Sequence, residues 1–479
     1  MLKYSLKFSF FIFILNTFFV SAQETSSYSY ESFIKDVLET NQDIEAQNII
    51  KRIDEANILQ AKAINDFTLG ADANYIYYED TDNGVSFSPT KIDGFSGGIS
   101  LSHTVEQTGT IASIEYGFDK QNLDFPANSF VQTPFSINLY QPALSISIVQ
   151  PLLNNLMGAQ YKLPKTLARF QKDINEVQTK ESIESILLSA SKSYLSWALL
   201  NKQIEITKNL IGKIKNQETL VHKQVKDGMA EKEEIYRIDS LLKEKEATLE
   251  SLQASYEALQ IALASFLYNK EISKSLKPEL PSIAKTLAEN DFIKTKSRIS
   301  KLCKLSVSMQ EDIVKTYKNN KLPDLSLVLN YKRHGSEDAF DDASWSGFAN
   351  DDFVAGLSFS FPVLNNSRKG SFLKEMYRLE KLRIENKQKL HQITQSYLSN
   401  KAKYSIYENV ISKQEASIND AQLKLSLLNK KYRQGRITLF EILNEEVNMF
   451  ISQMTLEKYK VDSLSIVLEM RELVDELYN

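Results

Sequence analysis

The residues best suited to catalysis or metal binding are few and far apart in this sequence. The four histidines, His103, His222, His334 and His391, do not follow the H-E-x-x-H spacing or a similar ligand pattern. The single cysteine, Cys303, excludes an internal disulfide and a zinc site built on paired thiolates, and we expect it to be an inert buried or half-buried thiol. Because no nucleophile, base or ligand set stands out by its spacing, the sequence predicts neither an enzyme nor a bound cofactor or metal.

The charged residues give no sign of a nucleic-acid partner or a calcium site. The chain has 57 basic and 61 acidic residues, so it lacks the basic excess of a nucleic-acid binder. Six acids between residues 337 and 352 could bind calcium, but they lack the ordered ligand spacing of a calcium loop. We therefore expect a solvated extracellular loop there.

The N-terminus indicates the compartment. Lys3 and Lys7 precede an apolar run over 8–20, and small residues follow it. This pattern predicts a signal peptide over 1–22, with cleavage before Gln23, and the run is short for a transmembrane helix. The residue directly after the cleavage site is not a cysteine, so we expect no lipid anchor. No later stretch approaches ~20 apolar residues, so a membrane location would require a β-barrel.

The elements that position any site follow from proline, glycine and apolar spacing. Proline is absent from 165–277 and from 363–479, which predicts two long helical zones. From Leu390 to Tyr432, steps of three and four residues pass through thirteen positions, eleven of them apolar. This is coiled-coil spacing. A shorter series of the same kind runs from Ile183 to Trp197 in the first zone.

Between the helical zones, apolar residues alternate with serine at a period of two. The alternation is clear over 99–102, 145–148 and 357–361. It suits a half-buried sheet and equally a membrane barrel, and the signal peptide favours the barrel. The first of these zones has four candidate strands, near 67–79, 95–106, 111–119 and 137–150, with a tight turn at Gly109. Two or four strands from this zone are both consistent with helices that leave and return on the same side.

The chain repeats itself. The segment VQPLLNN at 149–155 recurs as SFPVLNN at 360–366, and the glycines Gly228 and Gly435 occupy matching places later in each copy. The first copy covers 23–281, with a first helix, strands over 67–150, a long helix over 156–227 and a return helix over 231–270. The second copy covers 282–479, with a helix over 283–320, strands over 325–361, a long helix over 367–434 and a return helix over 437–478.

These motifs together resemble the TolC-like outer-membrane efflux factor family. The resemblance rests on the strand-to-helix exits at Pro151 and Pro362, on LPDL at 322–325, on YRQG at 432–435 and on EIL at 441–443. It implies an α+β membrane protein: a homotrimer with a β-barrel in the outer membrane of a Gram-negative bacterium, continued by a long α-helical periplasmic tunnel. Family members commonly give four strands per protomer to a twelve-strand barrel, and this sequence departs from that pattern if its central hairpin joins the barrel.

The resemblance also implies a function. Such a trimer is the passive conduit of a tripartite efflux or type I secretion system, joined through a periplasmic adaptor protein to an inner-membrane transporter. A periplasmic coiled-coil spacer without channel activity is the alternative, because it would explain both the signal peptide and the heptads. It would not explain amphipathic strands at matched points of both repeats.

Finally, the resemblance assigns roles near the two tips. Gly228 and Gly435 would form the periplasmic hairpin turns, because glycine readily adopts the left-handed conformation that ends a helix. The residues matched to the family's aperture and latch are Glu441, Asn444, Glu234, Tyr432 and Arg436.

Three of these matches carry specific expectations. Glu441 matches an aperture carboxylate, while the family's second carboxylate falls on the neutral Asn444. A carboxylate early in a helix is also favoured simply by the helix dipole, so Glu441 could be an ordinary solvated acid. Glu234 would accept a hydrogen bond from Tyr432, and the family's linking arginine falls beside Arg436, on Ile437.

Overall fold

The computed structural model describes residues 27–80, 88–127, 131–268, 270, 272–273, 276–283, 292–336 and 350–478. The expected signal peptide and most of the acidic loop lie outside these residues. The chain forms two compact units. The hairpin unit takes its residues from 1–41, 189–284 and 407–465, and the sheet unit takes its residues from 42–188, 285–406 and 466–479. Each sequence repeat contributes to both units.

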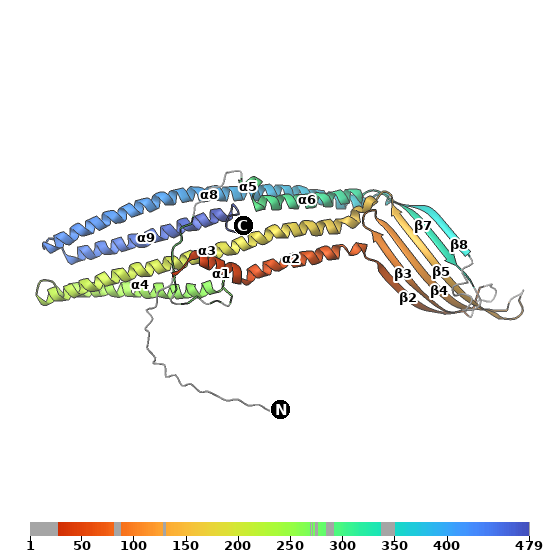
Figure 1. Cartoon of the computed structure of the whole chain (residues 1–479), viewed down its shortest axis with the longest axis horizontal. Helices are drawn as coiled ribbons and strands as arrows, with labels where there is room; N and C mark the ends of the chain where they lie inside the picture. The colour runs from red at the N-terminus through yellow and green to blue at the C-terminus, as the bar shows by residue number, and fades with distance from the viewer. Residues whose placement is uncertain are drawn as a thin grey trace, which may run out of the picture. The chain divides into compact units, whose positions relative to one another are not determined.

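The sheet unit contains one antiparallel sheet of six strands, in the order β2-β3-β4-β5-β7-β8 (Figure 1). The strands are β2 (Thr68–Glu79), β3 (Lys91–Val105), β4 (Thr110–Phe125), β5 (Phe135–Pro151), β7 (Asp324–His334) and β8 (Asn350–Ser360). The first repeat therefore provides four strands and the second provides two. The central hairpin β3–β4 belongs to the same sheet as the rest, which decides the strand number that the sequence left open.

Helices enter and leave this sheet at one end. The described helices that lie wholly in the sheet unit are α2 (Gln42–Ala61), α5 (Phe292–Thr295) and α6 (Arg298–Asn319). The short 3-10 turns η1 (Ala63–Asn65) and η2 (Leu156–Gly158) belong to the same unit. The sequence predicts one helix over 283–320, but the described part of this segment forms two. The break occurs because the Ser297 side chain accepts a hydrogen bond from the Ser300 amide and so caps α6 as a new helix.

The two longest helices contribute to both units, and each contains 68 residues: α3 (Ala159–Lys226) and α8 (Asn366–Arg433). The hairpin unit adds α1 (Tyr30–Thr40), α4 (Lys232–Ala264) and most of α9 (Leu439–Glu472), together with a short parallel pair of β1 (Ser27–Tyr28) and β6 (Lys277–Pro278). In this unit α4 returns along α3, and α9 returns along α8 (Figure 1).

The heptad positions expected on α3 and α8 form the packed sides of these helices. On α3, Ile183, Leu187, Ala190, Tyr194 and Trp197 are all at most 2% exposed. On α8, none of the thirteen positions from Leu390 to Tyr432 is exposed. The heptad prediction is confirmed, because a helix that was free in solvent would leave such a stripe uncovered.

The core of the hairpin unit joins the two helix hairpins. Its buried side chains come from α3, α4 and α9, and include Ile214, Ile238, Ile442 and Leu443. Because residues from opposite ends of the sequence share one apolar core, the two hairpins pack as a single body within this unit.

Candidate functional site

One face of the sheet presents apolar side chains to its surroundings. The cross-strand register aligns one residue from each strand into a continuous row: Leu69, Leu101, Ile114, Ile146, Tyr331 and Phe353. Leu69 is 72% exposed and Phe353 is 70% exposed. Apolar side chains that line up across six strands without a covering layer form an interaction surface.

The opposite face is polar. The next row of the register consists of Gly70, Ser100, Glu115, Ser145, Lys332 and Asp352. Successive side chains of a strand point to opposite faces, so this row lies on the reverse side from the apolar one. The sheet therefore has one apolar face and one polar face. Its outer strands, β2 and β8, each pair on one side within the described chain.

The acids predicted to lie in a solvated loop are in part components of this sheet. Asp351 and Asp352 are the second and third residues of β8 and lie opposite β7. The Tyr331 hydroxyl donates to Asp351 at 3.0 Å, and His334 Nε2 lies 3.0 Å from Asp352. These two carboxylates thus contact β7 side chains, and the remaining acids of the cluster lie outside the described residues.

The strand-to-helix exits are built on asparagine as well as proline. Pro151 is the last residue of β5, and Pro362 follows β8 by two residues. Asn155 and Asn365 then adopt positive φ angles of 61° and 48°, a conformation that asparagine tolerates better than most residues. The Asn155 side chain accepts a hydrogen bond from the Gln160 amide at 2.7 Å, which caps the start of α3.

The turn between β3 and β4 packs against the first exit. A Cβ on Gly158 would lie 1.8 Å from the Glu106 carbonyl oxygen, so only glycine permits this approach. Glu106 is 4% exposed, and its carboxylate accepts hydrogen bonds from Lys165 and Asn65, each at 2.8 Å. These contacts fix the central hairpin to the base of α3.

At the two tips, the expected glycines end their helices as predicted. Gly228 and Gly435 have φ angles of +73° and +70°. At the first tip, the Met229 amide donates to the Gln224 carbonyl at 2.8 Å; at the second, the Arg436 amide donates to the Lys431 carbonyl at 3.0 Å. Both are Schellman motifs, in which the glycine occupies the left-handed position.

The candidate aperture residues lie along the start of α9. Glu441 and Asn444 are exposed, whereas Ile442 and Leu443 between them are buried in the core. The spacing of three residues places Glu441 and Asn444 on one face of the helix. Arg436 is exposed at the turn, and its side chain forms no ion pair with the part of the chain that the structure describes.

Tyr432 has a different partner from the one the resemblance implied. Its hydroxyl accepts a hydrogen bond from Gln224 Nε2 at 2.7 Å, and no hydrogen bond joins it to Glu234 among the described residues. Gln224 lies on the last turn of α3 and faces α8, whereas Glu234 lies past the turn on α4. The pairing with Glu234 is therefore not the one this chain forms.

Two further acids contribute to the same region and were not singled out from the sequence. Glu446 is 7% exposed, and its Oε2 accepts a hydrogen bond from Gln217 Nε2 of α3 at 3.0 Å. Burial raises the pKa of the Glu446 carboxyl, against the opposing effects of Lys213 and Gln217. Glu445 is 8% exposed and pairs with Lys424 of α8 at 2.6 Å. The pair of consecutive acids at 445 and 446, within an amphipathic stretch, was the available signal.

Cys303 is buried, as expected, at 5% exposure. Burial raises the pKa of its thiol, which keeps the less reactive protonated form. Among the helices that the structure describes, none combines the length and the apolar composition needed to cross a membrane.

Sequence comparisons find neither a matching protein-family model nor a matching curated protein. Solved structures do match, and three of them are CusC, VceC from Vibrio cholerae and CmeC from Campylobacter jejuni. Their TM-scores are 0.69, 0.68 and 0.68, at 11%, 15% and 11% sequence identity. The alignments cover 93%, 93% and 94% of this chain and 91%, 95% and 86% of those chains, respectively.

VceC is an outer membrane protein, CmeC is an outer membrane channel and CusC forms a transmembrane channel. At these identities the likeness is one of fold. The chain therefore has a TolC-like fold, in which long helices continue from an antiparallel sheet, over nearly the whole of its described length.

Proposed function

We propose that three copies of this chain form an outer-membrane channel that serves as the passive outer conduit of a tripartite efflux or type I secretion system. The observation that supports this most directly is the six-strand apolar row, backed by a polar row on the opposite face. A sheet of this kind suits lipid on one side and water on the other. The likeness in fold to VceC, an outer membrane protein, and to CusC and CmeC, which form channels, supports the same function.

The open edges of the sheet support an oligomer. Unpaired strand edges are not tolerated in lipid, so β2 of one copy would pair with β8 of the next until the sheet closes. Three six-stranded sheets would give an eighteen-stranded barrel, wider than one with four strands from each chain. The shortest strands of the six-stranded sheet, β7 and β8, have 11 residues each, enough for a tilted strand to cross the hydrocarbon core.

The hairpin unit would form the periplasmic entrance. Threefold symmetry would bring three copies of the exposed Glu441 around one axis, where a ring of carboxylates attracts cations. Gln224–Tyr432 and Gln217–Glu446 tie the second hairpin to α3 and would resist opening. The tips of the hairpins would meet a periplasmic adaptor, which in turn binds an inner-membrane transporter. Residues 1–22 would direct the chain across the inner membrane.

A soluble periplasmic spacer accounts less well for the structure. A spacer needs the packed helices but has no use for an uncovered apolar sheet face, which would aggregate in water.

The experiment that tests the proposed function is extraction and electrical recording. We expect the full chain to fractionate with outer membranes as a trimer that dissociates on heating, and to conduct in planar lipid bilayers. A soluble monomer in the periplasm would refute the proposal.

The aperture role is tested in the same recordings. Glu441→Gln should lower cation selectivity and weaken block by multivalent cations while leaving the trimer intact. Glu250→Gln, which removes an exposed acid on α4, is the matched control and should leave both properties unchanged. If Glu441→Gln matches the control, Glu441 is an ordinary solvated acid at a helix start.

A further inference from the structure

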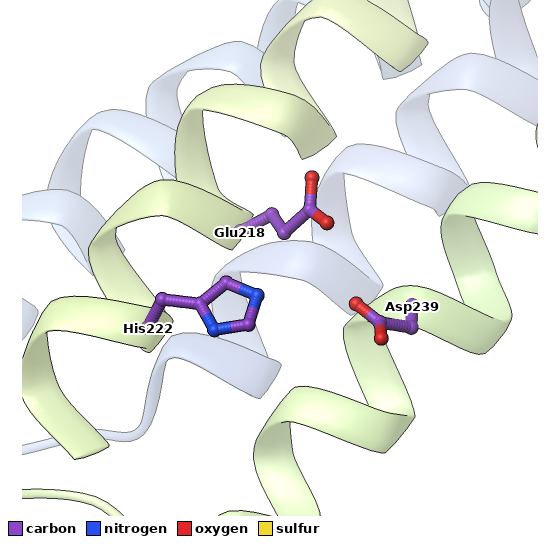
Figure 2. A group of neighbouring side chains, drawn as sticks. All are labelled: Glu218, His222 and Asp239. Carbon is purple, nitrogen blue, oxygen red and sulfur yellow. The ribbon is translucent and has the colours of Figure 1, made fainter. Parts of the chain in front are cut away.

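A histidine and two carboxylates come together between α3 and α4, away from the surfaces described above. Glu218 and His222 lie on successive turns of α3, and Asp239 lies on α4 (Figure 2). One ligand atom from each side chain lies within 4.8 Å of the other two. In Figure 2 the three side chains point into the space between the two helices.

No lysine or arginine among the described residues forms an ion pair with this group. The Oδ1 atom of Asp239 is buried from solvent and accepts no hydrogen bond. Neither Glu218 nor His222 forms an ion pair or a hydrogen bond with another side chain in the described ranges. An unpaired carboxylate oxygen removed from water costs free energy, and two carboxylates at this distance repel each other. A positively charged ligand would pair with the buried oxygen and would also offset the repulsion between the two carboxylates.

A second acidic group in the sheet unit shows how this chain satisfies such a cluster from within. Glu181, Glu184 and Asp475 also gather closely, but Arg298 forms ion pairs with all three. Its guanidinium takes the place that a metal ion would occupy. The group on α3 and α4 has no such arginine.

The donor types indicate which cation would bind. An imidazole nitrogen suits zinc, copper or nickel, whereas magnesium and calcium prefer sites made of oxygen alone. Zinc bonds of about 2.1 Å hold tetrahedral ligand atoms about 3.4 Å apart. Side-chain rotations that bring the three donor atoms up to about 1.4 Å closer together would complete such a geometry, and the exposed position of His222 leaves its ring free to rotate.

We propose that Glu218, His222 and Asp239 form a binding site for a divalent transition-metal ion of the zinc class, with three protein ligands and one position left for water. The ion would join α3 to α4 close to the first tip and hold that hairpin together. The inference rests on these side chains and does not depend on the proposed channel function.

The test is zinc titration of the purified full-length protein, by calorimetry, with one ion bound per chain as the expected result. His222→Ala and Asp239→Asn should each weaken zinc binding at least tenfold, and zinc should raise the melting temperature of the wild type but not of these two variants. Both substitutions keep the helix, since alanine favours it and asparagine matches aspartate in shape. His391→Ala removes an exposed histidine of α8 and should bind zinc as the wild type does.

Cobalt provides a second measurement, because its visible absorption reports nitrogen and oxygen coordination directly. We expect the wild type to give a cobalt absorption band that is absent in His222→Ala. Zinc should displace the bound cobalt and remove this band, whereas an equal concentration of calcium should not. Zinc binding to His222→Ala as tight as to the wild type, displacement of cobalt by calcium, or the absence of saturable zinc binding to the wild type would each overturn the proposal.

Discussion

Replacing Gly158 with alanine should break the contact that fixes the central hairpin β3–β4 to the base of α3. The new Cβ would lie 1.8 Å from the Glu106 carbonyl oxygen, and the residue has a φ of +66°. A left-handed conformation costs a residue with a Cβ about 1–2 kcal/mol. Forcing an extra carbon into a packed site costs a further ~1–3 kcal/mol. The two effects together predict a loss of about 3 kcal/mol per chain.

The clash cannot be relieved cheaply, because the atom that meets the new carbon is part of the backbone. Glu106 is held on the other side by hydrogen bonds from Lys165 and Asn65. A shift of the turn would therefore also separate this buried carboxylate from its partners, and the outcome should be loosening of β3–β4 rather than a local adjustment.

Gly117 provides the matched control. It lies within β4, and a Cβ there would have no heavy atom within 4 Å. Gly117→Ala should change the free energy of unfolding by less than about 1 kcal/mol. The change should be a slight increase in stability, because alanine loses less conformational freedom on folding than glycine does. The assay is guanidinium unfolding of the detergent-solubilised protein, followed by the circular dichroism of the sheet. If the free energies of unfolding of Gly158→Ala and Gly117→Ala differ by less than ~0.5 kcal/mol, the structural argument fails.

Three further predictions concern the hairpin unit. Gly435→Val should reduce export more than Gly212→Val at equal protein levels, because Gly435 has a positive φ and Gly212 lies inside α3; export assays that show equal defects would contradict the turn assignment. Because burial raises the pKa of Glu446 above its ordinary 4.5, the stability of the protein should fall as the pH rises through that raised pKa. Glu446→Gln should make stability depend less on pH, and melting curves of both proteins at several pH values measure this difference. Tyr432→Phe removes the acceptor for Gln224 and should raise channel conductance in planar bilayers, and a conductance equal to wild type would show that this hydrogen bond does not resist opening.

Local features of this molecule follow from the sequence alone. The left-handed turns at Gly228 and Gly435 follow from a residue type that readily adopts positive φ. The buried stripes of α3 and α8 follow from spacing of three and four, because side chains so spaced lie on one face of any helix. Alternating apolar residues place the strands for the same reason, with a period of two. Each of these features depends only on residues close together in the sequence, so it can be predicted without knowledge of the fold.

Long-range pairing required the tertiary structure. The alternation of β3 and β4 is the same whether their hairpin joins the main sheet or stands apart, and only the register of β4 with β5 assigns all six strands to one sheet. The partner of Tyr432 was decided in the same way. Gln224 and Glu234 lie on either side of the first turn, and the packing of α3 against the second hairpin brings Gln224 to the hydroxyl.

The group formed by Glu218, His222 and Asp239 combines both kinds of information. The spacing of four between Glu218 and His222 already places them on one face of α3. Asp239 joins them only because the chain reverses at Gly228 and α4 packs back along α3, an arrangement set by the shared apolar core. Sequence spacing determines which side chains a single helix can bring together, and tertiary packing determines which of them meet a partner from another helix.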